Sequence, residues 1–243
     1  MSTKLKASLR ASLFAGAGFV LSAVSAHATT LYSNNFEGGL TTDLSGSTTI
    51  IEAPNSSTAF LGPLSTNNNT GTVTLTLNTA GFTSLTLNYD VYAIMTLDGD
   101  GPAGGNTSDN PDAFIVTTNG GALTLLDASM ANFSGDTQGF PAPNSPPQTG
   151  ASAINTLGYG NSGDSTYSFS QTFAVTGSVT QISFTGQDNQ GTGDEFFGLD
   201  NVSVTGVPSI TSGTPEPASW ALMLLGFGAL GSALRARRRP VIA

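Results

Sequence analysis

Almost all of the side chains in this sequence that could do chemistry are carboxylates. Between Thr29 and Thr214 there is no lysine, arginine, histidine or cysteine, yet this interval holds all but one of the sixteen acidic residues. Serine and cysteine nucleophiles therefore lack a histidine base, and zinc or copper lacks its usual His/Cys ligands. Nucleic acid would be repelled, so we expect no nucleic-acid partner. The acids must be solvated, capped by backbone N–H groups or paired with bound cations.

One group of acids has the composition of a cation-binding loop. Asp98-Gly99-Asp100-Gly101 is followed by Asp109-Asn110-Pro111-Asp112, and such clusters favour cations that prefer oxygen ligands, above all calcium. The spacing is not that of an EF-hand loop, which carries a glutamate at its twelfth position. A solvated acidic turn is the alternative, since Asp and Gly are also ordinary turn residues. The acids that we expect to order this loop around calcium are Asp98, Asp100, Asp109 and Asp112.

Adjacent carboxylates raise the question of catalysis. Paired acids can hydrolyse glycosides without a histidine, and Asp194-Glu195 is such a neighbouring pair. Successive residues on a strand point to opposite faces, so these two side chains would not flank one bond. We therefore expect no enzyme activity. A carboxylate-based glycoside hydrolase, with its pair assembled from separate strands, is the enzyme alternative.

The segments that must position these acids have the pattern of β-strands. Thr72 to Leu77 alternates strictly between threonine and apolar residues, and Asn119-Gly120-Gly121 is a hairpin signal. Similar short strands separated by Gly, Asn and Asp predict an all-β domain, an antiparallel jelly-roll β-sandwich, over residues 29–206. A Ser/Thr/Gly/Pro linker follows at 207–214. The other expected strands lie within 85–91, 114–118, 122–126, 167–175, 182–184 and 196–204.

The N-terminus has the three parts of a secretory signal peptide, residues 1–28. A basic segment with Lys4, Lys6 and Arg10 precedes the short apolar stretch 11–24. Ala26-His27-Ala28 is a small-x-small cleavage site, so we expect signal peptidase to cut after Ala28. A retained N-terminal anchor is the alternative.

The C-terminus combines a tripeptide, an apolar run and a basic cluster. Pro215-Glu216-Pro217 precedes the uncharged run from Ala218 to Leu234. We expect this run to form a transmembrane helix over 218–234, roughly 25 Å long at about 1.5 Å per residue. Basic residues stay on the cytoplasmic side, so the chain before them is exported. The basic cluster consists of Arg235, Arg237, Arg238 and Arg239.

This order of features resembles the PEP-CTERM sorting signal of exopolysaccharide-producing Gram-negative bacteria. The resemblance covers residues 214–239 and includes Trp220 three residues after the tripeptide. It implies that an exosortase processes the chain near Pro215-Glu216-Pro217, with an inner-membrane-anchored intermediate that then reaches the cell surface or extracellular matrix. A plain membrane anchor is the alternative.

The two ends of the β-domain resemble the terminal strands of carbohydrate-binding-module-like β-sandwiches. The matching segments are Asn35-Phe36-Glu37-Gly38 and Gly198 to Val204. The resemblance implies that Glu37 and Asp200 lie close together and share a structural calcium. Two solvated acids at strand ends are the alternative.

These features together predict an exported β-sandwich with a structural or adhesive role beside an exopolysaccharide. A lectin-like module that binds a neutral glycan is the alternative in the class of binding proteins. Sugar sites need aromatic platforms, and the only tryptophan, Trp220, lies in the C-terminal apolar run.

Overall fold

Apolar residues that alternate with threonine and serine build most of the strands. The computed structural model describes residues 27–46, 49–68, 71–100, 111–160, 162–188, 190–209 and 217–237. Its elements in chain order are β1 (Thr29–Asn34), β2 (Leu44–Gly46), β3 (Ile50–Glu52), β4 (Ala59–Leu64), η1 (Thr66–Asn68), β5 (Thr72–Asn78), β6 (Phe82–Met95), β7 (Ala113–Thr118), β8 (Leu123–Ser129), β9 (Ala153–Ile154), β10 (Asp164–Ala174), β11 (Val179–Gln187), β12 (Glu195–Pro208) and α1 (Pro217–Arg237).

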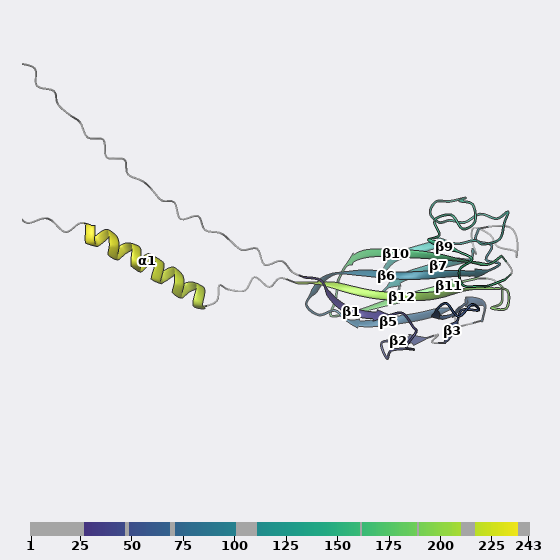
Figure 1. The fold of residues 1–243 in the computed structure, drawn as a ribbon, viewed down its shortest axis with the longest axis horizontal. Coiled ribbons are helices and arrows are strands. Elements are labelled where there is room, and N and C mark those ends of the chain that lie inside the picture. The colour runs from purple at the N-terminus through teal and green to yellow at the C-terminus, as the bar shows by residue number, and fades with distance from the viewer. Residues whose placement is uncertain are drawn as a thin grey trace, which may run out of the picture.

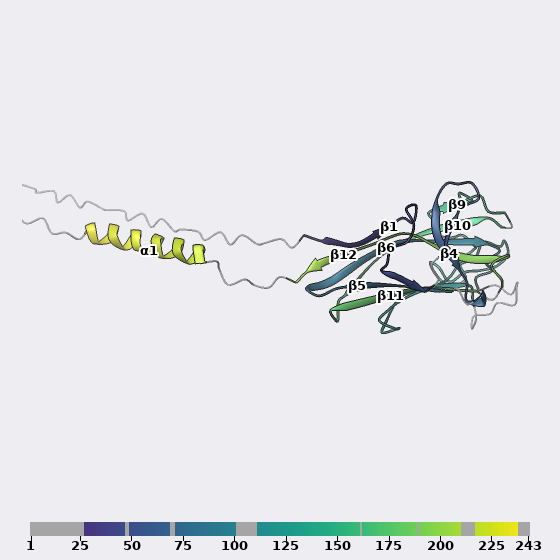
Figure 2. The same ribbon diagram turned by 90° about the horizontal axis from the view of Figure 1, so that it is seen from below.

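The strands form two antiparallel sheets that lie in two layers (Figures 1 and 2). One sheet has seven strands, in the order β3-β4-β12-β6-β10-β9, with β1 also paired to β12. The other has five, in the order β2-β5-β11-β7-β8. The antiparallel β-sandwich expected from the sequence is therefore confirmed.

The main core lies between the two sheets and contains aromatic contacts that join them. Tyr89 of β6 meets Phe184 of β11 edge-on, with ring centroids 5.5 Å apart. Phe114 of β7 meets Phe197 of β12 at 5.6 Å. All four rings are buried, and such contacts fix the distance and the register between the layers.

A second, smaller core covers the outer face of the seven-stranded sheet at one end. Phe60, Tyr92, Ile94 and Phe196 pack there with Leu157 from the segment after β9. Phe60 and Tyr92 meet edge-on with centroids 5.2 Å apart. The first six residues of β12 are consequently buried on both faces.

Local turn chemistry agrees with the sequence, but two boundaries do not. Asn119 and Gly120 have positive φ values of 48° and 69° and close the β7–β8 hairpin. Strand β12 runs on through Pro208, beyond the expected end at residue 206, because Val207 and Pro208 pair with β6. The strand therefore continues two residues past the expected domain end at 206, into the segment expected as the linker.

Strand β4 was not among the expected strands. Its sequence, Ala59 to Leu64, includes Gly62-Pro63 and has no alternation, since both faces are largely buried. Burial against β12 on one side and β3 on the other makes it a strand. Tertiary context here outweighs local propensity.

The cross-sheet aromatic contacts lead to a prediction about stability. Replacing Phe184 by alanine should lower the free energy of unfolding by about 3–5 kcal/mol, because the cavity lies between the sheets. Val179→Ala on the same strand is the matched control, since Val179 is 53% exposed. Urea unfolding of the purified chain in detergent measures both. Equal effects for the two variants would contradict the packing described here.

Candidate functional site

Four acids meet at one end of the sandwich, and three of them continue the inward-facing positions of a strand. Asp112 lies two residues before Phe114, and Glu195 lies two residues before Phe197, its ring partner in the opposite sheet. Asp188 follows β11 with the same parity as Phe184, because side chains two apart on a strand share a face. All three are buried. Together with Asp98, which follows β6, these residues form what we call the acid cluster.

The acid cluster brings carboxylates from separate strands close together. Asp98, Asp112 and Glu195 each offer an oxygen within 4.8 Å of the others and form a group of described residues that could hold a metal ion. The backbone N–H of Asp98 donates to Oδ2 of Asp112 over 2.7 Å. Nε2 of Gln190 donates to Oδ2 of Asp98 over 2.9 Å. Gly99 allows the tight turn here, with φ of 63° and the carbonyl of Thr137 where a Cβ would lie.

Several oxygens of these buried acids lack a hydrogen bond within the described residues. Glu195 is fully buried, and neither of its carboxylate oxygens has a partner there. Oδ1 of Asp188 accepts from the hydroxyl of Ser65 and from the backbone N–H of Asn67, whereas its Oδ2 has none. Such groups are rare in proteins because burying an unsatisfied charged oxygen is costly.

Burial, and after it the neighbouring acids, raise the pKa of three carboxyls. Burial first, and then the charges of Asp112, Asp98, Asp188 and Asp194, raise the pKa of Glu195 to about 9. Burial, followed by the charges of Asp112 and Asp136, raises the pKa of Asp98 to about 7. Burial raises the pKa of Asp188 to about 6, although hydrogen bonds from Ser65 and Asn67 oppose the shift.

The structure brings together only part of the loop expected to bind calcium. Asp98 and Asp112 lie in the acid cluster. Asp100 is not among the acids grouped with them; its backbone N–H bonds to the carbonyl of Thr137. Asp109 lies outside the described residues.

Sequence reasoning missed Glu195 and Asp188 as members of this site. Glu195 was weighed only as a catalytic partner of Asp194, which lies half-buried in the turn before β12. Strand alternation could have pointed to both residues. Each lies an even number of residues from a core-facing ring of its own strand, Glu195 from Phe197 and Asp188 from Phe184. Which strand ends meet cannot be derived from parity alone.

The structure places Glu37 and Asp200 on either side of one hydroxyl. Oγ1 of Thr58 lies 2.8 Å from Oε1 of Glu37 and 3.2 Å from Oδ2 of Asp200. Oδ2 of Asp200 also accepts from the hydroxyl of Tyr92 over 2.7 Å. We call this group the terminal site, because it joins the turn after β1 to the bulge in β12, next to Asn201 at φ 50°.

The two acids of the terminal site have opposite environments. Glu37 is exposed, and two hydrogen bonds lower its pKa. The larger effect comes from the backbone N–H of Ala59 and the smaller from the hydroxyl of Thr58. Asp200 is buried, and that burial raises its pKa against the hydrogen bonds from Tyr92, Asn201 and Thr58. Burial and the contact with Asp200 also raise the pKa of Tyr92.

The C-terminal apolar run forms the helix expected there. Helix α1 covers Pro217–Arg237, three residues longer at its C-terminal end than the expected span. Its apolar side chains are exposed, among them Trp220, Leu222 and Phe227. Within the described part of the chain, no helix is both long and apolar enough to cross a membrane.

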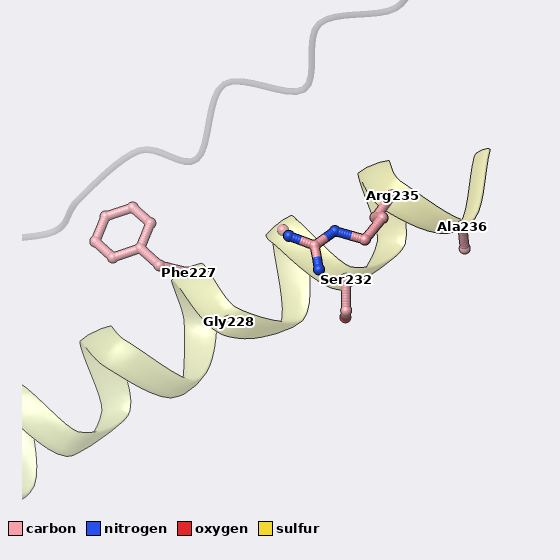
Figure 3. Close-up of a pocket in the computed structure, with 6 residues that line it drawn as sticks. Phe227, Gly228, Ser232, Arg235 and Ala236 are labelled. Carbon is pink, nitrogen blue, oxygen red and sulfur yellow. The ribbon is translucent and has the colours of Figure 1, made fainter. Parts of the chain in front are cut away.

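Helix α1 also carries a shallow hollow on its surface (Figure 3). Every residue that lines it belongs to this one helix, so the hollow is the surface between neighbouring side chains and has no second wall. We assign it no function. Its lining residues are Phe227, Gly228, Gly231, Ser232, Arg235 and Ala236.

The remaining residues expected to act in processing lie at the edges of the described chain. Strand β1 begins at Thr29, the first residue after the expected cleavage, and Ala28 is exposed. Arg235 and Arg237 lie in the last turn of α1, which begins at Pro217. Ala26, Pro215, Glu216, Arg238 and Arg239 lie outside the described residues.

Comparison with protein families decides the nature of the C-terminus. Residues 214–239 match the PEP-CTERM protein-sorting motif. A chain that carries this motif is exported, anchored in the membrane and then processed to the cell surface. The motif implies processing along the pathway of signal peptidase and exosortase.

Two solved structures have a similar chain path. One is the K3 cleaved adhesin domain of Lys-gingipain from Porphyromonas gingivalis, with a TM-score of 0.36 and 12% identity; the match covers 74% of this chain and 99% of that domain. The other is an exo-β-1,3-galactanase from Phanerochaete chrysosporium, with a TM-score of 0.34 and 17% identity; the match covers 72% of this chain and 29% of the galactanase. No curated protein matches the sequence.

The raised pKa values lead to a prediction about pH. Folded Glu195, Asp98 and Asp188 hold protons to higher pH than the unfolded chain, whose acids titrate near 4. Their contribution to stability is therefore present at low pH and is lost as pH rises from about 4 to about 9. In the presence of a chelator, urea unfolding at pH 5, 7 and 9 should show decreasing stability.

Glu195→Gln is the informative variant for this pH series, because it removes the group with the largest upward shift. It should flatten the decrease, whereas Glu52→Gln, at an exposed site on β3, should leave it unchanged. Stability that rises between pH 5 and 9 in the chelated protein would show that these acids are not crowded.

Proposed function

We propose that this chain is a non-catalytic β-sandwich displayed at the cell surface, where it has a structural or adhesive role beside exopolysaccharide. The observation that carries the proposal is the sorting motif attached to a domain without any basic residue. The motif directs the chain outward, and the domain lacks the side chains of most catalytic and anion-binding sites.

The arrangement of the strands supports a display role. Thr29 of β1 pairs with Gly206 of β12, so both ends of the domain leave it on the same side. Glu195 begins β12, at the other end of this strand from Gly206, about 36 Å away at roughly 3.3 Å per residue. The acid cluster therefore lies at the end of the domain farthest from the membrane-directed segment.

Burial of the acids favours a non-catalytic role over a glycoside hydrolase. Glu195 and Asp112 have no exposed surface, and Asp98 is 3% exposed. A glycosidic bond must lie between its two catalytic carboxyls, and a polysaccharide cannot reach carboxyls that are enclosed between the sheets.

The tyrosines favour a structural role over lectin-like binding. Tyr32, Tyr89, Tyr92 and Tyr167 are buried. Tyr159 is only partly buried, but it packs edge-on against Phe196 at 5.8 Å. The four buried rings therefore offer no open face on which a sugar could stack, and the fifth is partly covered by Phe196.

The terminal site supports a structural calcium as part of the same proposal. The hydroxyl of Thr58 has one proton and lies within hydrogen-bonding distance of both Glu37 and Asp200. It can therefore satisfy only one carboxylate at a time. A calcium ion between them would bind the first strand to the last and add its binding energy to folding.

The sorting signal gives the first test of this function. Replacing Pro215-Glu216-Pro217 by three alanines should leave the chain in the membrane fraction, because the processing signal is lost while the anchor and arginines stay. The same replacement at Thr211-Ser212-Gly213, outside the motif, is the control. Mass spectrometry of the wild-type surface form should find no peptide from Arg235 to Ala243. An intact C-terminus in that pool would contradict the proposal.

The role beside exopolysaccharide gives the second test. The purified surface form should co-sediment with the exopolysaccharide of its host when calcium is present and release no reducing ends from it. Binding to a panel of neutral glycans without the host polymer would favour the lectin-like alternative instead. Release of reducing ends would overturn the non-catalytic assignment.

A further inference from the structure

We propose that Asp98, Asp112 and Glu195, with Asp188 beside them, form a calcium site that joins the two sheets at the end of the domain farthest from the sorting motif. This site is separate from the terminal site and does not depend on the role proposed for the surface form. Two of its acids, Glu195 and Asp188, lie far along the sequence from the other two, Asp98 and Asp112.

The strongest observation is the carboxylate of Glu195. It is fully buried, and neither oxygen has a hydrogen-bond partner among the described residues. It nevertheless faces the carboxylates of Asp98 and Asp112 within 4.8 Å. A buried, unpaired carboxylate that faces two others needs a positive group between them.

The protein itself supplies no such group. No lysine, arginine or histidine occurs between Thr29 and Thr214, so the positive charge must come from a proton or from a cation in the medium. Proton and cation therefore compete for the same oxygens.

The donor set fits calcium better than other common cations. Three carboxylates with two oxygens each, and Oδ2 of Asp188 nearby, provide an all-oxygen site of the kind that calcium binds with six to eight ligands. Zinc and copper prefer nitrogen or sulfur ligands, which are missing here. Magnesium keeps several of its waters and binds through one or two carboxylates, which fits poorly with a site enclosed between sheets.

The neighbouring contacts hold the acids in place without using all of their oxygens. Ser65 and the backbone of Asn67 bind Oδ1 of Asp188 and leave Oδ2 unpartnered among the described residues. Gln190 binds Oδ2 of Asp98 over 2.9 Å. Such outer contacts orient metal ligands in known sites.

The position of the acid cluster would allow one bound ion to connect strand ends from both sheets. Asp98 follows β6 and Glu195 begins β12 in the seven-stranded sheet, while Asp112 precedes β7 and Asp188 follows β11 in the five-stranded sheet. One ion would therefore join four strand ends and both layers. In a chain without cysteine, it would take the place of a disulfide that closes this end of the sandwich.

Thermal unfolding of the full chain in detergent, with either calcium or a chelator, tests the proposal. For the wild type, calcium should raise the melting temperature well above that in EDTA, and magnesium at equal concentration should raise it less. For Glu195→Gln, the rise with calcium should shrink and the calcium affinity measured by calorimetry should fall at least tenfold. Glu52→Gln is the matched control and should behave as the wild type does.

The direction in which Glu195→Gln shifts the melting temperature in EDTA distinguishes a metal ligand from an acid that only supports the packing. Without calcium, Glu195→Gln should melt above the wild type, because glutamine is neutral in this site without taking up a proton or a cation. Asp200→Asn, in the terminal site, should leave the calcium response of the acid cluster intact. If the terminal site also binds calcium, this variant should bind one calcium ion fewer than the wild type.

Two results would overturn the proposal. One is a calcium response of Glu195→Gln equal to that of the wild type. The other is a lower melting temperature of Glu195→Gln in EDTA as well as in calcium, which would show that the buried acid acts through a proton and the packing around it. Failure of the polysaccharide and sorting tests would leave this inference untouched, because these measurements use the purified chain alone.

Discussion

Buried carboxylates without a basic partner are the constraint on which the rest of this structure depends. In most proteins an arginine or lysine would neutralise groups such as Glu195 and Asp112, but here every basic residue lies outside the sandwich. Charge therefore accumulates where the strand ends meet, and the pKa of Glu195 and Asp98 rises in response. Whatever neutralises these acids also determines how firmly the two sheets are held together at that end.

The same fold that crowds the acids also encloses them. The Phe114–Phe197 contact sets the register between the layers, and one step further along both strands that register places Asp112 opposite Glu195. The small outer core around Phe60 and Phe196 then covers β12 from the other side. Packing of apolar rings thus brings buried carboxylates together, and the close approach of these acids creates the need for a neutralising charge.

The distribution of charge also fits export and display. Basic residues are confined to the two targeting segments, so no positive charge in the domain competes with those that set the orientation in the membrane. Calcium is plentiful outside cells, so the ion that we propose for the acid cluster is available to an exported domain. Because both domain ends leave at the Gly206 side, the acid cluster lies at the opposite end of the sandwich.

The sequence by itself determined the export signals, the β class and the chemistry that is excluded, because each of these depends on composition or on local order. Alternation in β5 and the Asn119-Gly120 turn were predictable for the same reason. Strand β4, with no alternation to reveal it, became a strand only through burial between β3 and β12. The meeting of Asp98, Asp112, Asp188 and Glu195 was likewise decided by tertiary structure alone. Parity shows which face of a strand a residue takes, but the order of strands and the packing of two sheets, which depend on contacts far apart in the chain, decide which residues it meets.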